Sequence, residues 1–195
     1  MTLVSADTES GGISLDCSLL SVCFSLLNGK LEPIHTLNLK VKPDPDADGR
    51  VAYKIQAEAL AVNGINLIEH DKAAITYKES KPIIYNWLKE MHDSYGSLTF
   101  FGNNIQRDID LITNYTISEN SWNNFCDRRV IDTSVIGKFL QLAGKIPEDQ
   151  SLSLSKITKY YGVDVSKYGV HTSDGDVLLG IELIKNYLKE ISQTN

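Results

Sequence analysis

The sequence predicts an α/β fold in which helices flank a mixed β-sheet. Three apolar runs in the first 41 residues have the length of strands, and turn residues separate them. Beyond residue 80, segments with helical apolar spacing alternate with short apolar runs. Three successive strands followed by alternating helices and strands imply an α/β fold with a mixed sheet.

The first three strands are predicted to form an antiparallel meander. Residues 2–7 are a short apolar run that leads into Asp7, and Gly11-Gly12 breaks the pattern. A second strand is expected over Leu19–Leu27, and Asn28-Gly29 favours a two-residue hairpin turn. The third strand, Ile34–Val41, alternates apolar and polar residues as a half-buried strand does.

The middle of the chain is expected to be irregular over residues 42–72, where turn chemistry is frequent. A short helix is predicted from Gln56 to Val62, ending at Asn63-Gly64. The next helix is predicted to begin at a Ser80 cap with Pro82 in its first turn, and Gly96 is expected to end it.

The second half is expected to alternate short strands with helices. The predicted elements are a strand over Leu98–Phe101, a helix over Gln106–Tyr115, a strand over Val130–Ile131, a helix capped by Asp132 or Thr133 through Leu142, a helix from Ser151 or Ser153 to Gly162, and a final helix over Ser173–Ile191.

The composition fits one globular domain over residues 1–195, with 42% hydrophobic and 23% charged residues. The net charge of −6 provides no global basic field for nucleic acid, although a local basic patch would suffice. Three cysteines without metal-binding spacing, Cys17, Cys23 and Cys126, indicate reduced thiols in a cytoplasmic protein. The polar start predicts no signal peptide, and no apolar run approaches the ~20 residues of a membrane span.

Acidic residues at the edges of predicted elements are the most informative feature. Asp7 and Glu9 are two apart on a predicted strand, so both side chains face the same way. Asp108 lies in the first turn of a predicted helix, and His171 precedes Asp176 at the start of the last one. Carboxylates from distant segments suggest a divalent-metal site, and a nearby histidine suggests a proton acceptor for water.

Each of these residues alone has a simpler interpretation. An acidic pair at a strand end is usually solvated, and an acidic residue in the first turn of a helix is favoured by the helix dipole without any function. A lone histidine is more often a surface or capping residue. The conjunction of all of them, in this order, is what favours a site.

That conjunction resembles the DEDDh group of 3′–5′ exonucleases, whose core is ribonuclease-H-like. The group includes proofreading subunits of bacterial DNA polymerases, ribonuclease T and oligoribonucleases. The matching segments are Asp7-Thr8-Glu9-Ser10-Gly11-Gly12, Gly102-Asn103-Asn104 followed by Asp108, and His171-Thr172-Ser173-Asp174-Gly175-Asp176. The resemblance spans nearly the whole chain and implies a ribonuclease-H-like fold.

Two residues depart from the pattern of that group. Asn103 stands where the group usually has histidine, and Arg107 stands where it usually has an aromatic residue. Arg107 is either a phosphate contact, which its planar fork suits, or a surface residue. A sister group has tyrosine four positions before the last Asp, and Thr172 occupies that position here, so the histidine version is favoured.

The resemblance implies a role for each site residue. Asp7, Glu9, Asp108 and Asp176 would bind two divalent cations, Mg²⁺ or Mn²⁺. His171 would accept the proton of the attacking water, which a histidine that is neutral at physiological pH can do. Contacts with the terminal nucleotide are expected from Ser10, Gly11, Gly12, Ile13, Asn104 and Arg107. Trp122, Phe125 or Tyr168 would stack on bases, with core packing as the alternative.

The implied activity is metal-dependent 3′–5′ hydrolysis of single-stranded nucleic acid to nucleoside 5′-monophosphates. The look of the chain, that of a small stand-alone or phage-like exonuclease, favours DNA over RNA as substrate. The alternatives are a non-catalytic nucleic-acid-binding or polymerase-associated module of the same fold, and a related enzyme that cuts internally. A polymerase or a second copy of the chain remains open as a partner.

Overall fold

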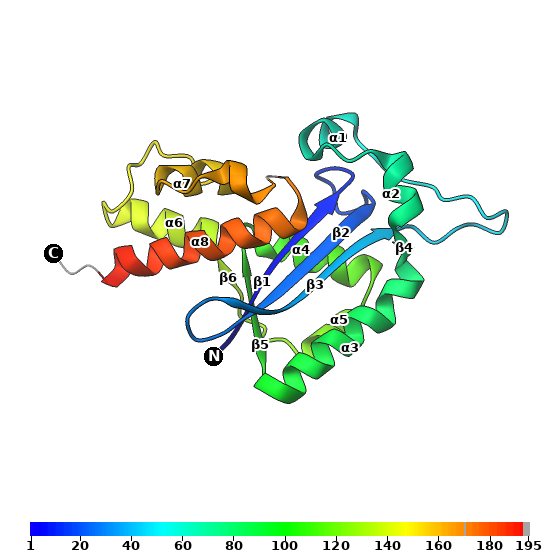
Figure 1. The fold of residues 1–195 in the computed structure, drawn as a ribbon, viewed down its shortest axis with the longest axis horizontal. Coiled ribbons are helices and arrows are strands. Elements are labelled where there is room, and N and C mark those ends of the chain that lie inside the picture. The colour runs from blue at the N-terminus through cyan, green and yellow to red at the C-terminus, as the bar shows by residue number, and fades with distance from the viewer. Residues whose placement is uncertain (170, 193–195) are drawn as a thin grey trace.

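The protein is described here by a computed structural model that covers residues 1–169 and 171–192. Its centre is a six-stranded sheet in the order β4-β3-β2-β1-β5-β6 (Figure 1). The strands are β1 (Thr2–Ser10), β2 (Leu19–Leu27), β3 (Pro33–Lys42), β4 (Ile75–Thr76), β5 (Leu98–Gly102) and β6 (Ile131–Asp132). The first three strands are antiparallel, whereas β4, β5 and β6 each run parallel to the neighbour they join. The predicted mixed sheet is therefore confirmed.

Helices cover both faces of the sheet, and Figure 1 shows α6, α7 and α8 gathered at one flank and α3 with α5 at the other. The helices are α1 (Ala57–Asn63), α2 (Leu67–Ala73), α3 (Tyr77–Tyr95), α4 (Ile105–Tyr115), α5 (Glu119–Asn123), α6 (Thr133–Leu142), α7 (Leu154–Tyr160) and α8 (Ser173–Ser192), with a 3₁₀ turn at Val165–Tyr168. Of the helices within the described ranges, none is long and apolar enough to cross a membrane.

Two cores lie on opposite faces of the central strands. Alternate residues of β2 separate between them: Phe24 joins the core under α3, α4 and α5, and Cys23 joins the core under α8. Since apolar residues of β2 serve both faces, the whole strand is buried. All three cysteines are buried and free of disulfides in the part of the chain that the structure describes. Strand β1 lies between β2 and β5 and is the rigid support of the site described below.

The predicted two-residue hairpin at Asn28-Gly29 is wrong. A type I′ turn needs positive φ at both central residues, but here the positive φ falls at Leu31 (59°). The side chain of Asn28 instead accepts hydrogen bonds from the backbone N–H groups of Lys30 and Glu32, which makes a longer loop before β3.

The predicted start of the third helix at Ser80 is also wrong, because a stronger cap lies four residues earlier. Thr76 and Glu79 form a reciprocal capping box: the Glu79 N–H donates to Thr76 Oγ1 and the Thr76 N–H donates to Glu79 Oε2. Ser80 is buried inside α3, and Pro82 lies within the helix. The ends of α1 at Gly64 and of α3 at Gly96 are as predicted. Helices α2 and α5 and strand β4 were not predicted.

Candidate metal and substrate site

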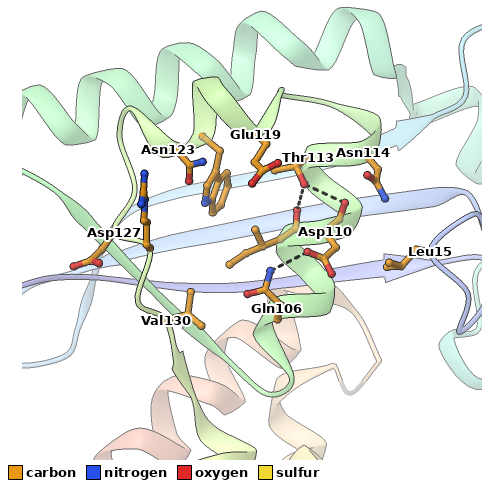
Figure 2. A pocket seen from close by; sticks show the side chains of 12 residues that line it. Leu15, Gln106, Asp110, Thr113, Asn114, Glu119, Asn123, Asp127 and Val130 are labelled. Carbon is orange, nitrogen blue, oxygen red and sulfur yellow. Dashed lines mark hydrogen bonds between the residues drawn. The ribbon is translucent and has the colours of Figure 1, made fainter.

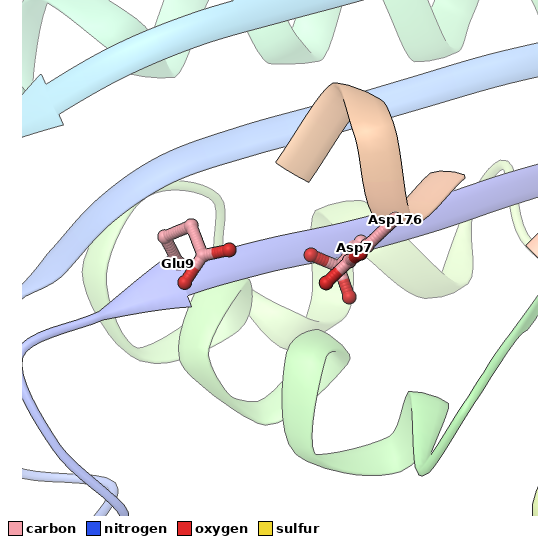
Figure 3. Close-up of side chains that lie close together, drawn as sticks. All are labelled: Asp7, Glu9 and Asp176. Carbon is pink, nitrogen blue, oxygen red and sulfur yellow. The ribbon is translucent and has the colours of Figure 1, made fainter. Parts of the chain in front are cut away.

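Three carboxylates from two distant segments meet at the end of β1. Asp7 and Glu9 project from the same face of β1, just before the pairing with β2 shifts register at Ser10. Asp176 comes from the first turn of α8, the helix that packs across β1. One ligand oxygen from each of the three lies within 4.8 Å of the others (Figure 3). We call Asp7, Glu9 and Asp176 the carboxylate triad.

The triad is electrostatically strained without a cation. Burial, followed by the charges of Asp108, Asp176 and Glu9, raises the pKa of Asp7 well above its ordinary value. Burial and the Asp176 charge raise the pKa of Glu9 to about 8, and burial raises that of Asp176. Asp7 Oδ2 is buried and has no hydrogen-bond partner among the described residues. Oxygen donors, converging charge and an unpaired buried oxygen fit a hard divalent cation.

Asp108 lies close to the triad but does not belong to it. Its Oδ1 accepts hydrogen bonds from the Thr8 N–H (3.0 Å) and the Thr8 Oγ1 (2.6 Å). Thr8 faces the opposite side of β1 from Asp7 and Glu9, so α4 presents Asp108 from behind the strand. Burial raises the pKa of Asp108 to about 7, and the hydrogen bond from Thr8 opposes that rise. Asp108 is therefore a buried acid whose charge reaches Asp7 and whose position Thr8 fixes.

His171 lies at the rim of the site. It is exposed and has a left-handed backbone conformation, with φ of 65°. Its backbone N–H donates to Asp176 Oδ1 at 3.4 Å, which links its loop to the triad. The residue lines a cleft of about 430 Å³ together with Glu9, so its side chain opens onto the same space as one triad member.

A second cleft, of about 560 Å³, adjoins Glu9 on the side of the Ser10–Ile13 turn. The turn is held close to the segment before α1: the Gln56 N–H donates to Gly11 O (2.6 Å) and the Ile13 N–H donates to Gln56 Oε1 (3.0 Å). A Cβ on Gly11 would meet Lys54 O at 2.5 Å, and one on Gly12 would meet Gln56 Oε1 at 2.4 Å. Gly11 is thus needed for close approach to the backbone, whereas the atoms nearest Gly12 belong to the side chains of Gln56 and Cys17. Ile13 remains 86% exposed.

Two predicted substrate contacts are already engaged with the protein. Asn104 has φ of 60°; its N–H donates to Asp132 Oδ1, and its side-chain oxygen accepts from Ser134. It lines neither cleft beside the triad. Arg107 lines the second cleft, but its guanidinium donates to the Ser10–Ile13 turn.

Two of the predicted stacking residues are part of the core. Trp122 is 4% exposed and Phe125 is 8% exposed, both in the core beneath α3, α4 and α5. The alternative of core packing is therefore confirmed for both, whereas Tyr168 is partly exposed.

Sequence reasoning missed three contributors to the site, Thr8, Gln56 and Asn63. Their roles depend on partners 43 to 100 positions away: Gln56 accepts from the Ile13 N–H, Asn63 donates to Ser10 O, and Thr8 donates to Asp108. The signal that would have found Thr8 is its place between Asp7 and Glu9, which sends it to the other face of β1.

A further cavity, of about 570 Å³, lies beside α4 and reaches as far as Leu15 (Figure 2). Gln106, Asp110 and Thr113 line it, and Gln106 donates to Asp110 Oδ1. It contains no triad member, so we do not count it as part of the site.

Comparisons with known proteins found similarity in structure alone: no protein-family model and no curated protein sequence matches the chain. E. coli Exonuclease I in complex with a dT13 oligonucleotide is 18% identical, with a TM-score of 0.68 over 97% of this chain and 42% of that one. Exonuclease I from Methylocaldum szegediense is 19% identical, with a TM-score of 0.64 over 95% and 40%. Cell-death related nuclease 4 is 14% identical, with a TM-score of 0.64 over 96% and 64%.

This chain has the fold of these nucleases. The ribonuclease-H-like α/β fold predicted from the sequence is confirmed by that likeness. The chain spans only about two fifths of the length of the Exonuclease I chains. At these identities the likeness establishes the fold, and the activity has to be argued from the site.

Proposed function

We propose that this protein is a metal-dependent 3′–5′ exonuclease that hydrolyses single-stranded nucleic acid to nucleoside 5′-monophosphates. The observation that carries the proposal is the carboxylate triad at the end of β1, one of whose oxygens, Asp7 Oδ2, is buried without a hydrogen-bond partner among the described residues. The fold is shared with nucleases that were crystallised with single-stranded oligonucleotides, which supports the choice of substrate.

The proposed site residues divide into ligands and a proton acceptor. Asp7, Glu9 and Asp176 would hold two divalent cations, Mg²⁺ or Mn²⁺, and Asp108 would complete the set through its charge beside Asp7. Bound cations would activate water and neutralise charge on the phosphate. The four acids would be ionised in that state, because the positive charge of the cations would offset their mutual repulsion.

His171 would accept the proton of the attacking water from its place at the rim of the cleft beside Glu9. The water oxygen bonds to the terminal phosphorus, and the bond from phosphorus to the preceding 3′-oxygen breaks. The leaving oxygen takes up a proton from solvent, so the products are a nucleoside 5′-monophosphate and a shortened strand with a free 3′-hydroxyl.

The cleft of about 560 Å³ beside Glu9 would receive the terminal nucleotide. Gly12 and Ile13 of the turn line it, together with α1 residues such as Ala59. Ile13 is exposed and apolar, which suits contact with a base, and the turn backbone lies close to the triad. We favour DNA over RNA because the structural neighbours that were crystallised with oligonucleotides carry DNA.

A 5′-labelled single-stranded DNA oligonucleotide tests the proposal directly. With Mg²⁺ or Mn²⁺ the label should pass through a ladder of strands shortened by one nucleotide at a time, and a chelator should stop the reaction. Asp7→Ala should be inactive yet folded, and a matched RNA strand should be cut more slowly. Internal fragments at the earliest time points, or cutting that survives the chelator, would contradict the proposal. Binding without any cleavage would favour a non-catalytic module.

A further inference from the structure

Arg107 makes three contacts with a single turn of the chain. It occupies the first turn of α4, directly before Asp108, and is half-buried. Its Nη2 donates to Ser10 Oγ at 2.9 Å and to Gly12 O at 2.6 Å, and its Nε donates to Ile13 O at 3.4 Å. Ser10 Oγ itself donates to Gly12 O at 2.8 Å, so the three groups form a closed network.

Gln56 holds the same turn from the other side. Its Oε1 accepts from the Ile13 N–H at 3.0 Å, and its backbone N–H donates to Gly11 O at 2.6 Å. The peptide groups on both sides of Ile13 are therefore satisfied by protein, one through Arg107 and the other through Gln56. The side chain of Ile13 is left 86% exposed on a backbone that Arg107 and Gln56 hold at four points.

We propose that Arg107 and Gln56 together act as a clamp that fixes the Ser10–Ile13 turn as one wall of the nucleotide cleft. Arg107 is then a positioning residue, in place of the phosphate contact predicted from the sequence. Both clamp residues line the cleft that contains Glu9. The inference rests on the proposed function for the identity of the ligand, although the clamp itself is a property of the protein alone.

The shape of the arginine side chain is the reason for its use here. A planar guanidinium presents several N–H groups in a fixed fork, and this fork spans a hydroxyl and two carbonyls at once. A lysine ammonium would carry the same charge without the fork. Lysine at position 107 therefore separates the effect of geometry from the effect of charge.

Because the clamp already orders the Ser10–Ile13 turn, the bound nucleotide does not have to order it. When the clamp is removed, the free protein samples open turns, and only the closed fraction binds. The loss affects substrate and transition state equally, so KM should rise while kcat changes little. We expect KM for the oligonucleotide to rise by about tenfold in Arg107→Ala, which corresponds to a closed fraction of about one tenth.

Hydrogen exchange gives a readout that does not depend on activity. The Gly11 N–H donates to Ser18 O and the Ile13 N–H donates to Gln56, so both amides report on the closed turn. Arg107→Ala, Arg107→Lys and Gln56→Ala should each accelerate exchange at these amides. The Asp176 N–H in α8, which donates to the O of Thr172 just before the helix, should be unchanged. Arg129→Ala, which removes an exposed arginine, is the matched charge control.

The outcomes separate the clamp from its alternatives and from the proposed function. Wild-type KM and exchange in Arg107→Lys would overturn the clamp, since charge alone would then suffice. Unchanged exchange in Arg107→Ala together with a raised KM would also overturn it, in favour of direct phosphate binding. If the protein cleaves no oligonucleotide, the proposed function fails, but hydrogen exchange at the Gly11 and Ile13 amides still tests the clamp. If Arg107→Ala and Gln56→Ala change KM and amide exchange equally, and the double variant shows no further change, the result would support a single clamp formed by both residues.

Discussion

Replacing Glu9 by glutamine should make the metal-free protein more stable. Burial and the charge of Asp176 raise the pKa of Glu9 from 4.5 to about 8. A carboxyl whose pKa is raised in the folded state binds protons that the unfolded chain has released. Between those two values stability falls as the pH rises, because the folded state must keep or reacquire the proton. Glutamine has nearly the same shape and no charge, so Glu9→Gln removes this penalty.

The size of the effect follows from the pKa of Glu9. At pH 7 the unfolded carboxyl is ionised, 2.5 units above its pKa of 4.5, while the folded carboxyl with a pKa of about 8 is mostly protonated. At about 1.36 kcal/mol per unit, the penalty is on the order of 3 kcal/mol. This is an upper bound, because solvent in the cleft screens part of the charge. For a chain of this size it corresponds to a rise in Tm of roughly 6–12 °C.

Thermal unfolding in EDTA, followed by circular dichroism, measures this effect. The Tm of Glu9→Gln should exceed that of the wild type at pH 7, and the difference should shrink below about 1 kcal/mol at pH 5, near the ordinary pKa of the carboxyl. Saturating Mn²⁺ should reverse the order, since the variant has lost a ligand charge. A variant that is less stable than wild type in EDTA at pH 7, or a gain that persists at pH 5, would refute the reasoning.

Three further predictions concern the same region. Mn²⁺ at about 100 times its Kd should stabilise the wild type by about 2.7 kcal/mol and raise its Tm by roughly 5–11 °C, as measured by scanning calorimetry. Asp176→Asn should largely abolish this rise in Tm. Thr8→Val removes the hydroxyl that donates to Asp108 Oδ1 and should lower the free energy of unfolding in urea by about 1–3 kcal/mol. An unchanged free energy of unfolding would show that this hydrogen bond does not stabilise the fold. Gly102→Ala would place a Cβ 2.6 Å from Ala6 O and should cost about 1–3 kcal/mol by the same measurement, whereas exposed Gly29→Ala is the control.

Much of the fold was predictable because its elements carry their signals locally. The alternation in Ile34–Val41 and the glycines that end α1 and α3 are properties of a few adjacent residues, and the structure agrees with them. The errors at Asn28-Gly29 and Ser80 have a common cause. In each case two local signals competed, and the stronger one depended on a pair of residues a few positions apart. Asn28 pairs with Glu32 in the loop, and Thr76 pairs with Glu79 in the helix cap.

The triad was predictable in part for the same reason. The spacing of Asp7 and Glu9 on a strand sets their shared direction, and Asp176 lies in the first turn of a helix whose start is evident in the sequence. The partners of Asp108 and Arg107 were not predictable, since Thr8 and Ser10 lie about 100 positions away in the sequence. A sequence pattern records which residue types are present, but hydrogen bonding between β1 and α4 exists only after folding.

The position of β1 holds the acidic site in a fixed place. The strand is paired on both edges, with β2 and with β5, and it is covered by α8 on one face and by α4 on the other. Asp7 Oδ2 is buried between these elements and has no hydrogen-bond partner among the described residues. Protonation and cation binding both relieve the repulsion among these acids, and they compete for the same oxygens. Lowering the pH should thus weaken Mn²⁺ binding in the range where Glu9 and Asp108 take up protons, near their pKa values of about 8 and about 7.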